Sequence, residues 1–117
     1  MLTGCAQYWQ GEPAPNGLPT LVEALEATNQ SISRSGPKAL IVGETGWPSG
    51  GDNFGAAIAC PACLQKYYTD AACWLQKNRV SWFWFSAFDE PLKQPAVEKN
   101  FGIATFEKTP KISFRCP

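Results

Sequence analysis

The stretch ALIVGETGWPSGG, residues 39–51, contains a short apolar run that ends on a carboxylate at Glu44. A continuous apolar run with branched residues is typical of a strand that is buried on both faces of its sheet. The Gly, Trp and Pro residues just beyond Glu44 predict a turn. Glu44 is therefore either an ordinary solvated residue at the end of a strand or the reactive group of a site that the strand holds in place.

The remaining elements place this strand in an α/β fold. Apolar residues recur at helical spacing in 18–33, and a second helix is expected from about Pro61 to Asn78. A second apolar strand is expected at 80–85, with Trp82 and Trp84 in the core. Residues 7–17 are rich in Gly and Pro, which predicts a loop. In parallel βα architectures the long connections and the ligands lie at the carboxyl ends of the strands.

A second charged cluster follows the second strand. The sequence AFDEPLK places Asp89, Glu90 and Lys93 just past its end. Neighbouring strands lie about 5 Å apart, so parallel strands bring such ends together. A lysine at position 93 near Glu44 would favour the ionised carboxylate. We therefore predict one site built from Glu44 and this cluster, in which Asp89, Glu90 and Lys93 bind substrate.

Three loop aromatics, Tyr8, Trp9 and Trp47, are expected at the rim of the same opening, together with Phe88. Aromatic faces among polar groups suit the alternating apolar and hydroxyl surfaces of a sugar ring. Packing in the core is the alternative for these rings, and for the three loop residues we favour the binding role.

The composition excludes several classes of partner and chemistry. Ten basic and ten acidic residues cancel, so neither a nucleic acid nor an anionic membrane surface is an expected partner. No apolar run approaches the roughly 18 residues of a membrane span, and no signal peptide is visible at the N-terminus. The absence of histidine removes imidazole catalysis and His-ligated metals, so we predict no metal and no cofactor.

Five cysteines, at positions 5, 60, 63, 73 and 116, favour an oxidising compartment. The pair Cys60 and Cys63 at the start of the second helix permits a thiol-redox module, because a helix N-terminus lowers a thiol pKa. Structural disulfides are the favoured alternative. One free thiol and two bridges leave fifteen pairing schemes, and the sequence does not choose among them.

Taken together, IVGETGWPSGG, FWFSAFDEPLK and VEKNFGI resemble glycoside hydrolase family 17, which contains β-1,3-glucan endohydrolases and glucanosyltransferases. The QYWQG segment resembles an aromatic turn of the same family. The resemblance spans most of the chain and keeps the order and spacing of the motifs. One departure is Leu92, where microbial members usually carry Trp before the lysine.

The resemblance implies a (β/α)₈ TIM barrel and a retaining mechanism on β-1,3-glucan, with Glu44 as the nucleophile and Glu90 and Lys93 supporting it. Such a barrel takes about 250 residues, so residues 1–117 would form part of a catalytic domain, from about the end of strand six to strand eight. The general acid would lie upstream, because Glu12, Glu23 and Glu26 occupy unsuitable places. A secreted or cell-wall location is implied. The alternatives are a non-catalytic β-glucan-binding remnant and the redox module.

Overall fold

The structure, a computed structural model, describes residues 6–117. Its elements, in chain order, are α1 (Ala6–Trp9), η1 (Ala14–Asn16), α2 (Gly17–Ser33), β1 (Ile41–Thr45), α3 (Pro61–Lys77), β2 (Ser81–Trp84) and η2 (Ala96–Asn100). The two long helices and the two strands begin and end within a few residues of their predicted positions. No helix among residues 6–117 is both long and apolar enough to cross a membrane.

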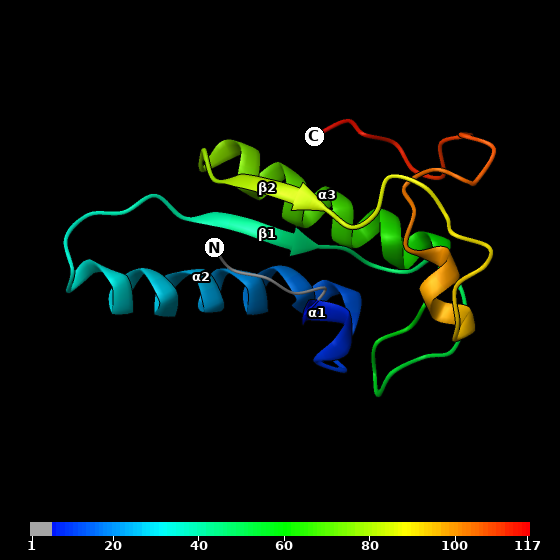
Figure 1. The fold of residues 1–117 in the computed structure, drawn as a ribbon, viewed down its shortest axis with the longest axis horizontal. Helices are drawn as coiled ribbons and strands as arrows, with labels where there is room; N and C mark the ends of the chain where they lie inside the picture. The colour runs from blue at the N-terminus through cyan, green and yellow to red at the C-terminus, as the bar shows by residue number, and fades with distance from the viewer. Residues whose placement is uncertain (1–5) are drawn as a thin grey trace.

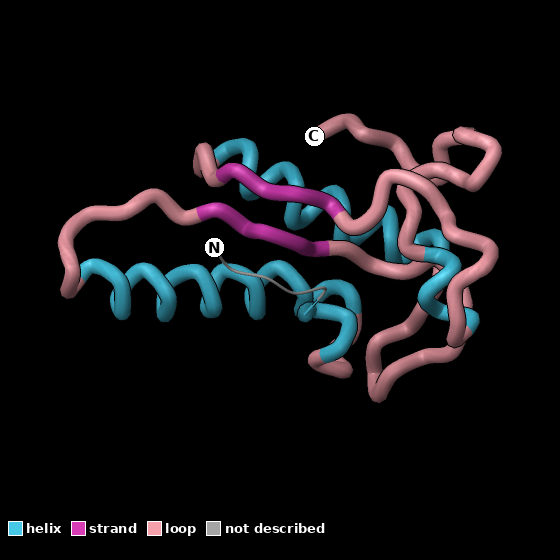
Figure 2. The backbone as a smooth tube through the Cα atoms, in the orientation of Figure 1, coloured by secondary structure: helices cyan, strands magenta, loops and turns pink. Residues whose placement is uncertain are grey.

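The sheet of the described chain consists of two parallel strands, as the sequence predicted. Figure 1 shows α2 running alongside β1 and α3 lying behind the strands, so both long helices belong to one side of the sheet. The long connection from β1 to α3 and the segment after β2 gather at the same end of the molecule, where the strands point (Figures 1 and 2). This is the end at which the candidate site residues lie.

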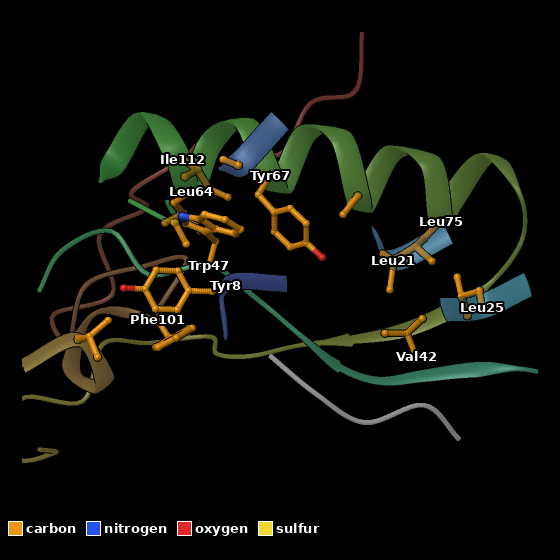
Figure 3. Packing of buried hydrophobic residues seen from close by; sticks show 14 residues of the cluster. Tyr8, Leu21, Leu25, Val42, Trp47, Leu64, Tyr67, Leu75, Phe101 and Ile112 are labelled. Atoms are coloured by element: carbon orange, nitrogen blue, oxygen red, sulfur yellow. The ribbon is translucent and has the colours of Figure 1, made fainter. Parts of the chain in front are cut away.

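The core fills the space between helices and sheet and has two parts (Figure 3). Under the strands it is aliphatic, with Leu21, Leu25, Val42 and Leu75. Beyond the strand ends it is largely aromatic, with Tyr8, Trp47, Tyr67 and Phe101 fully or almost fully buried. The tilted and edge-on ring contacts in this second part are typical of favourable aromatic packing.

The sequence-based expectation for the strands is corrected on one point. Both were expected to be buried on two faces, yet Ile41 of β1 is 39% exposed and Phe83 of β2 is 64% exposed. Val42 and the half-buried Trp82 and Trp84 pack toward the core instead. The physical reason is that the described chain supplies helices for only one face of the sheet.

The N-terminal segment also differs from prediction, since residues 7–17 were expected to form a loop. They contain α1, η1 and the first residue of α2. Burial of Tyr8 and Ala14 draws this segment against the core. The gain from burying a tyrosine ring competes with the Gly and Pro content, which favours irregular structure.

Two disulfides join cysteines whose pairing the sequence left open. Cys60 bonds to Cys63 at the start of α3, and Cys73 of α3 bonds to Cys116 near the C-terminus. Gln65 also holds the C-terminal tail by accepting from the amide of Ser113 at 2.7 Å. These links favour structural roles for the four cysteines, whereas Cys5 lies outside the described residues.

Candidate active site

Glu44 lies at an irregular step in the register of the sheet. Val42 pairs with Trp82 and Thr45 pairs with Trp84, so two residues of β1, Gly43 and Glu44, stand opposite one residue of β2. This arrangement is a β-bulge, a feature that re-aims side chains and is over-represented next to active sites. Glu44 was expected just past its strand, and the structure places it within β1 instead.

The residue after Glu44 is anchored to the helical layer. Thr45 is fully buried, and its hydroxyl lies 2.7 Å from the hydroxyl of Tyr67 on α3 and 3.2 Å from Oε1 of Gln7. Thr45 therefore faces the helices. Glu44 itself is half-buried. Val42 and Thr45 are both buried although they are three positions apart, so the usual alternation of side chains is interrupted at Gly43 and Glu44.

The turn that follows Glu44, residues 46–49, is held in place by contacts with other segments. A side chain on Gly46 would place its Cβ 2.0 Å from the carbonyl oxygen of Phe85, so only glycine fits here. Trp47 is buried and donates its indole N–H to the carbonyl of Ile58 at 2.9 Å. Ser49 donates its amide to the carbonyl of Asn100 in η2, also at 2.9 Å. The turn is thus tied to three separate segments.

Glu90 and Lys93 form an ion pair near this turn. Their side chains pair at 2.7 Å, and the Lys93 ammonium lies 4.7 Å from the centre of the Phe85 ring. Phe85 in turn donates its amide to the carbonyl of Thr45 at 2.7 Å. A chain of contacts therefore joins the Glu90–Lys93 pair to Thr45, the residue beside Glu44.

Asp89 has a different position from the one expected. Its Oδ1 accepts from the ammonium of Lys111 at 2.6 Å and from the amide of Gly102 at 3.0 Å, and both side chains of the ion pair are mostly buried. These contacts hold the segment after β2 against the chain near the C-terminus. We therefore assign Asp89 to positioning this part of the molecule rather than to direct contact with a substrate.

The expectation that Tyr8 and Trp47 rim the opening is corrected. Both rings are 0% exposed and pack edge-on against each other at a centroid distance of 5.4 Å. The Tyr8 hydroxyl donates to the carbonyl of Asp52, and burial, with a smaller contribution from the charge of Asp52, raises the pKa of Tyr8. No face of either ring is open to a sugar, because α1, which carries Tyr8, and the turn after β1, which carries Trp47, pack into the core.

Trp9, the last residue of α1, does reach the surface. It is 39% exposed, and its ring meets that of Phe54 at a centroid distance of 5.2 Å. Phe54, which is 45% exposed, was not among the residues predicted from sequence. It lies in the long connection between β1 and α3, where aromatic content gives the only sequence signal. Phe88 is also 45% exposed, consistent with the expectation that it lies near the surface.

The other acidic side chains singled out from sequence lie away from this site. Glu12 is exposed and accepts from Asn16 at 3.1 Å. Glu23 and Glu26 are exposed on α2. Among residues 6–117, no group of three or more His, Cys, Asp or Glu side chains could hold a metal ion.

Comparisons with known proteins agree with this geometry. Residues 3–102 match the family described as BtgE/BtgC glycoside hydrolase domain. The chain is therefore of the glycoside hydrolase class.

Related sequences and structures identify the family. The chain is 30% identical to a glucan 1,3-beta-glucosidase of Arthroderma benhamiae and 33% identical to one of Schizosaccharomyces pombe, covering 99% and 93% of the chain. It superposes on a family 17 β-1,3-glucanosyltransferase of Rhizomucor miehei with a TM-score of 0.82 and 32% identity, over 93% of its length. The chain belongs to glycoside hydrolase family 17, as its motifs predicted.

The matched proteins are longer than this chain. It spans 42% of the Arthroderma glucosidase, 36% of the Schizosaccharomyces glucosidase and 40% of the Rhizomucor glucanosyltransferase. An active-site mutant of the Rhizomucor enzyme has been solved in complex with laminaritriose, and it matches this chain with the same TM-score and 31% identity.

Proposed function

We propose that this chain contributes the nucleophile side of an active site that cleaves β-1,3-glucan with retention of configuration. The observation that supports the proposal is the position of Glu44 at the irregular step of the sheet. Its neighbour Thr45 accepts from the amide of Phe85, and the Phe85 ring lies against Lys93 of the Glu90–Lys93 pair. The names of the relatives supply the substrate class. In barrel terms, residues 1–117 correspond to the end of strand six through strand eight of a catalytic domain.

In this mechanism the Glu44 carboxylate attacks the anomeric carbon, and the bond to the leaving sugar oxygen breaks as a second carboxyl group donates its proton. Water or another sugar then displaces Glu44 with help from the same second group. Retaining enzymes hold the two carboxyls about 5–5.5 Å apart. We place the second carboxyl outside these 117 residues, because Glu12 is exposed and hydrogen-bonded to Asn16, and Glu23 and Glu26 are exposed on α2. Glu90 and Lys93 orient the nucleophile and sugar hydroxyls.

The test is Glu44→Gln in the full polypeptide that the gene encodes. The amide keeps the shape of the side chain but cannot attack carbon, so sugar release from laminarin should fall by at least about 10³-fold while oligosaccharide binding persists. Mass spectrometry with a slow fluorinated glycoside should find a glycosyl adduct on the wild type and none on the variant. Glu26→Gln is the matched control. It makes the same chemical change at an exposed position of α2 and should behave as wild type.

The second candidate is a glucan-binding protein without catalysis, favoured by the exposed Trp9–Phe54 pair, which needs no acid to hold a sugar. The 117-residue chain by itself should release no reducing sugar from laminarin, since acid catalysis alone contributes about 10²–10⁴-fold. Retention on insoluble glucan by the full polypeptide, with no turnover and no adduct on Glu44, would favour the binding role. Insulin reduction without glucan affinity would instead favour thiol chemistry at Cys60 and Cys63. A secreted or wall-associated location is proposed from the two disulfides.

A further inference from the structure

A short motif on α2 takes no part in the candidate active site. Asn29, Gln30 and Ser31 form the pattern Asn-x-Ser, in which the middle residue is not proline, and this pattern occurs once in the 117 residues. It is the acceptor pattern for N-linked oligosaccharides, a modification that places a bulky hydrophilic group on a protein surface. Because so short a pattern also arises by chance, the surroundings of Asn29 decide whether it can be used.

The structure leaves the motif accessible. Asn29, Gln30 and Ser31 are all exposed, whereas the buried residues of α2 are Gly17, Leu21 and Leu25. The side-chain amide of Asn29 makes no hydrogen bond with another residue of the described chain. An oligosaccharide on this nitrogen therefore displaces no polar contact of the fold.

A shallow hollow lies beside Asn29. It has a volume of about 160 Å³ and is lined by Leu25, Glu26, Asn29, Leu40, Trp74 and Val80. This volume is below the usual range of ligand pockets, roughly 300–1,000 Å³, so the hollow does not suit a free ligand. A group that is covalently attached beside it needs less contact area, because the attachment raises its effective concentration.

The lining suits the first sugar of an N-linked oligosaccharide. Leu40, Trp74 and Val80 are only partly buried and pack on the core, so part of their apolar surface faces the hollow. The first sugar, an N-acetylglucosamine, is joined directly to the amide nitrogen and has apolar C–H groups and an acetyl methyl group. Covering apolar surface that is otherwise in contact with water stabilises the folded state.

Asn29 also lies far from the end of the molecule that carries the candidate active site. It is in the last two turns of α2, and residues 34–40 lead from there to the start of β1 (Figure 1). Glu44 lies near the other end of β1, toward which the strand points. An oligosaccharide at Asn29 therefore leaves the candidate site open.

We propose that Asn29 carries an N-linked oligosaccharide whose first sugar covers the hollow at Trp74. In the transfer, the side-chain nitrogen of Asn29 forms a bond to the anomeric carbon of an oligosaccharide carried on a polyprenyl pyrophosphate. The nitrogen loses a proton, the bond from that carbon to the pyrophosphate oxygen breaks, and the lipid pyrophosphate leaves. The inference rests on the proposed secreted location, because the transfer takes place in the secretory compartment in which disulfides form.

The first experiment determines whether Asn29 is modified. The full polypeptide is secreted from yeast, and the peptide that contains Asn29 is analysed by mass spectrometry before and after enzymatic removal of N-linked sugars. The wild type should carry an oligosaccharide on Asn29, and Asn29→Gln and Ser31→Ala should carry none. Ser33→Ala is the matched control, because it removes an exposed hydroxyl of α2 outside the motif, and it should keep the modification.

Two results would overturn the modification. Secreted wild type with an unmodified Asn29 would show that the proposal is wrong while the secreted location stands. Protein that is retained in the cytosol would show that the location and the modification are both wrong.

The second experiment tests the contact with the hollow. An endoglycosidase trims the secreted protein so that only the first N-acetylglucosamine remains on Asn29. The same wild-type sequence, made in a bacterial periplasm where disulfides form without this modification, should melt about 2 °C lower than the trimmed protein. Equal melting temperatures would show that the first sugar does not cover the hollow, and that part of the proposal would be wrong.

Discussion

The carbonyl oxygen of Phe85 occupies the space that a side chain on Gly46 would fill, 2.0 Å from the position of its Cβ. This contact brings the backbone after Glu44 against the backbone after β2, at the point where the Phe85 amide also donates to Thr45. Close approach of the two strand ends depends on the absence of a side chain. Gly46 therefore helps to fix the backbone next to Glu44.

Gly46→Ala is expected to lower the free energy of unfolding by about 3 kcal/mol, because the new methyl group must displace backbone rather than a flexible side chain. Urea denaturation measures the change. Gly50→Ala, in the same turn, is the control: its Cβ would meet the Asn100 side chain at an ordinary 3.6 Å, so a change within about 0.5 kcal/mol is expected. Equal losses for the two variants would contradict the role given to Phe85.

The hydroxyl of Tyr67 anchors the end of β1 through its buried contacts with Thr45 and Gln7. Tyr67→Phe leaves those two polar groups buried with one partner fewer, and we expect a loss of about 1–2 kcal/mol in unfolding free energy. Tyr68→Phe, a half-buried neighbour on α3, should cost less. If Tyr67→Phe were neutral while Tyr68→Phe destabilised, the anchor for β1 would have been misassigned.

Alkaline pH should destabilise the fold. Burial raises the pKa of Tyr8 and of Tyr68 above the ordinary value of 10.0, with the charge of Asp52 adding to the shift of Tyr8. The folded state then holds these protons more tightly than the unfolded chain, so the stabilisation is complete below pH 10 and is lost as pH rises through the higher folded-state values. Melting temperatures from pH 8 to 11 should fall above pH 10, less steeply in Tyr68→Phe. A flat profile would contradict the shift.

The uncovered face of the sheet should make the 117-residue chain associate. Ile41 and Phe83 expose apolar surface beside strand edges that have no neighbouring strand in the described chain, and both features promote association. Light scattering should report a mass above that of a monomer, increasing with concentration, and Phe83→Lys should reduce it. A monodisperse monomer with a cooperative melting transition would be evidence against this expectation.

The sequence by itself determined the elements and the family. Helical spacing predicted α2 and α3, two apolar runs predicted parallel strands, and the ordered motifs around Glu44 and Glu90 identified family 17. These signals are readable because periodicity and motif spacing are local properties of the chain. The sequence also indicated structural disulfides, without their pairing.

Only the tertiary structure decided how the individual side chains are used. It placed Tyr8 and Trp47 in the core, put Asp89 in an ion pair with Lys111, and left Phe106 on the surface. Each outcome depends on contacts between segments far apart in sequence. Whether an aromatic ring is buried or exposed depends on which segments pack against it, and a local sequence pattern does not determine those segments. The same reason explains the β-bulge at Glu44, since register is a property of two strands and not of one.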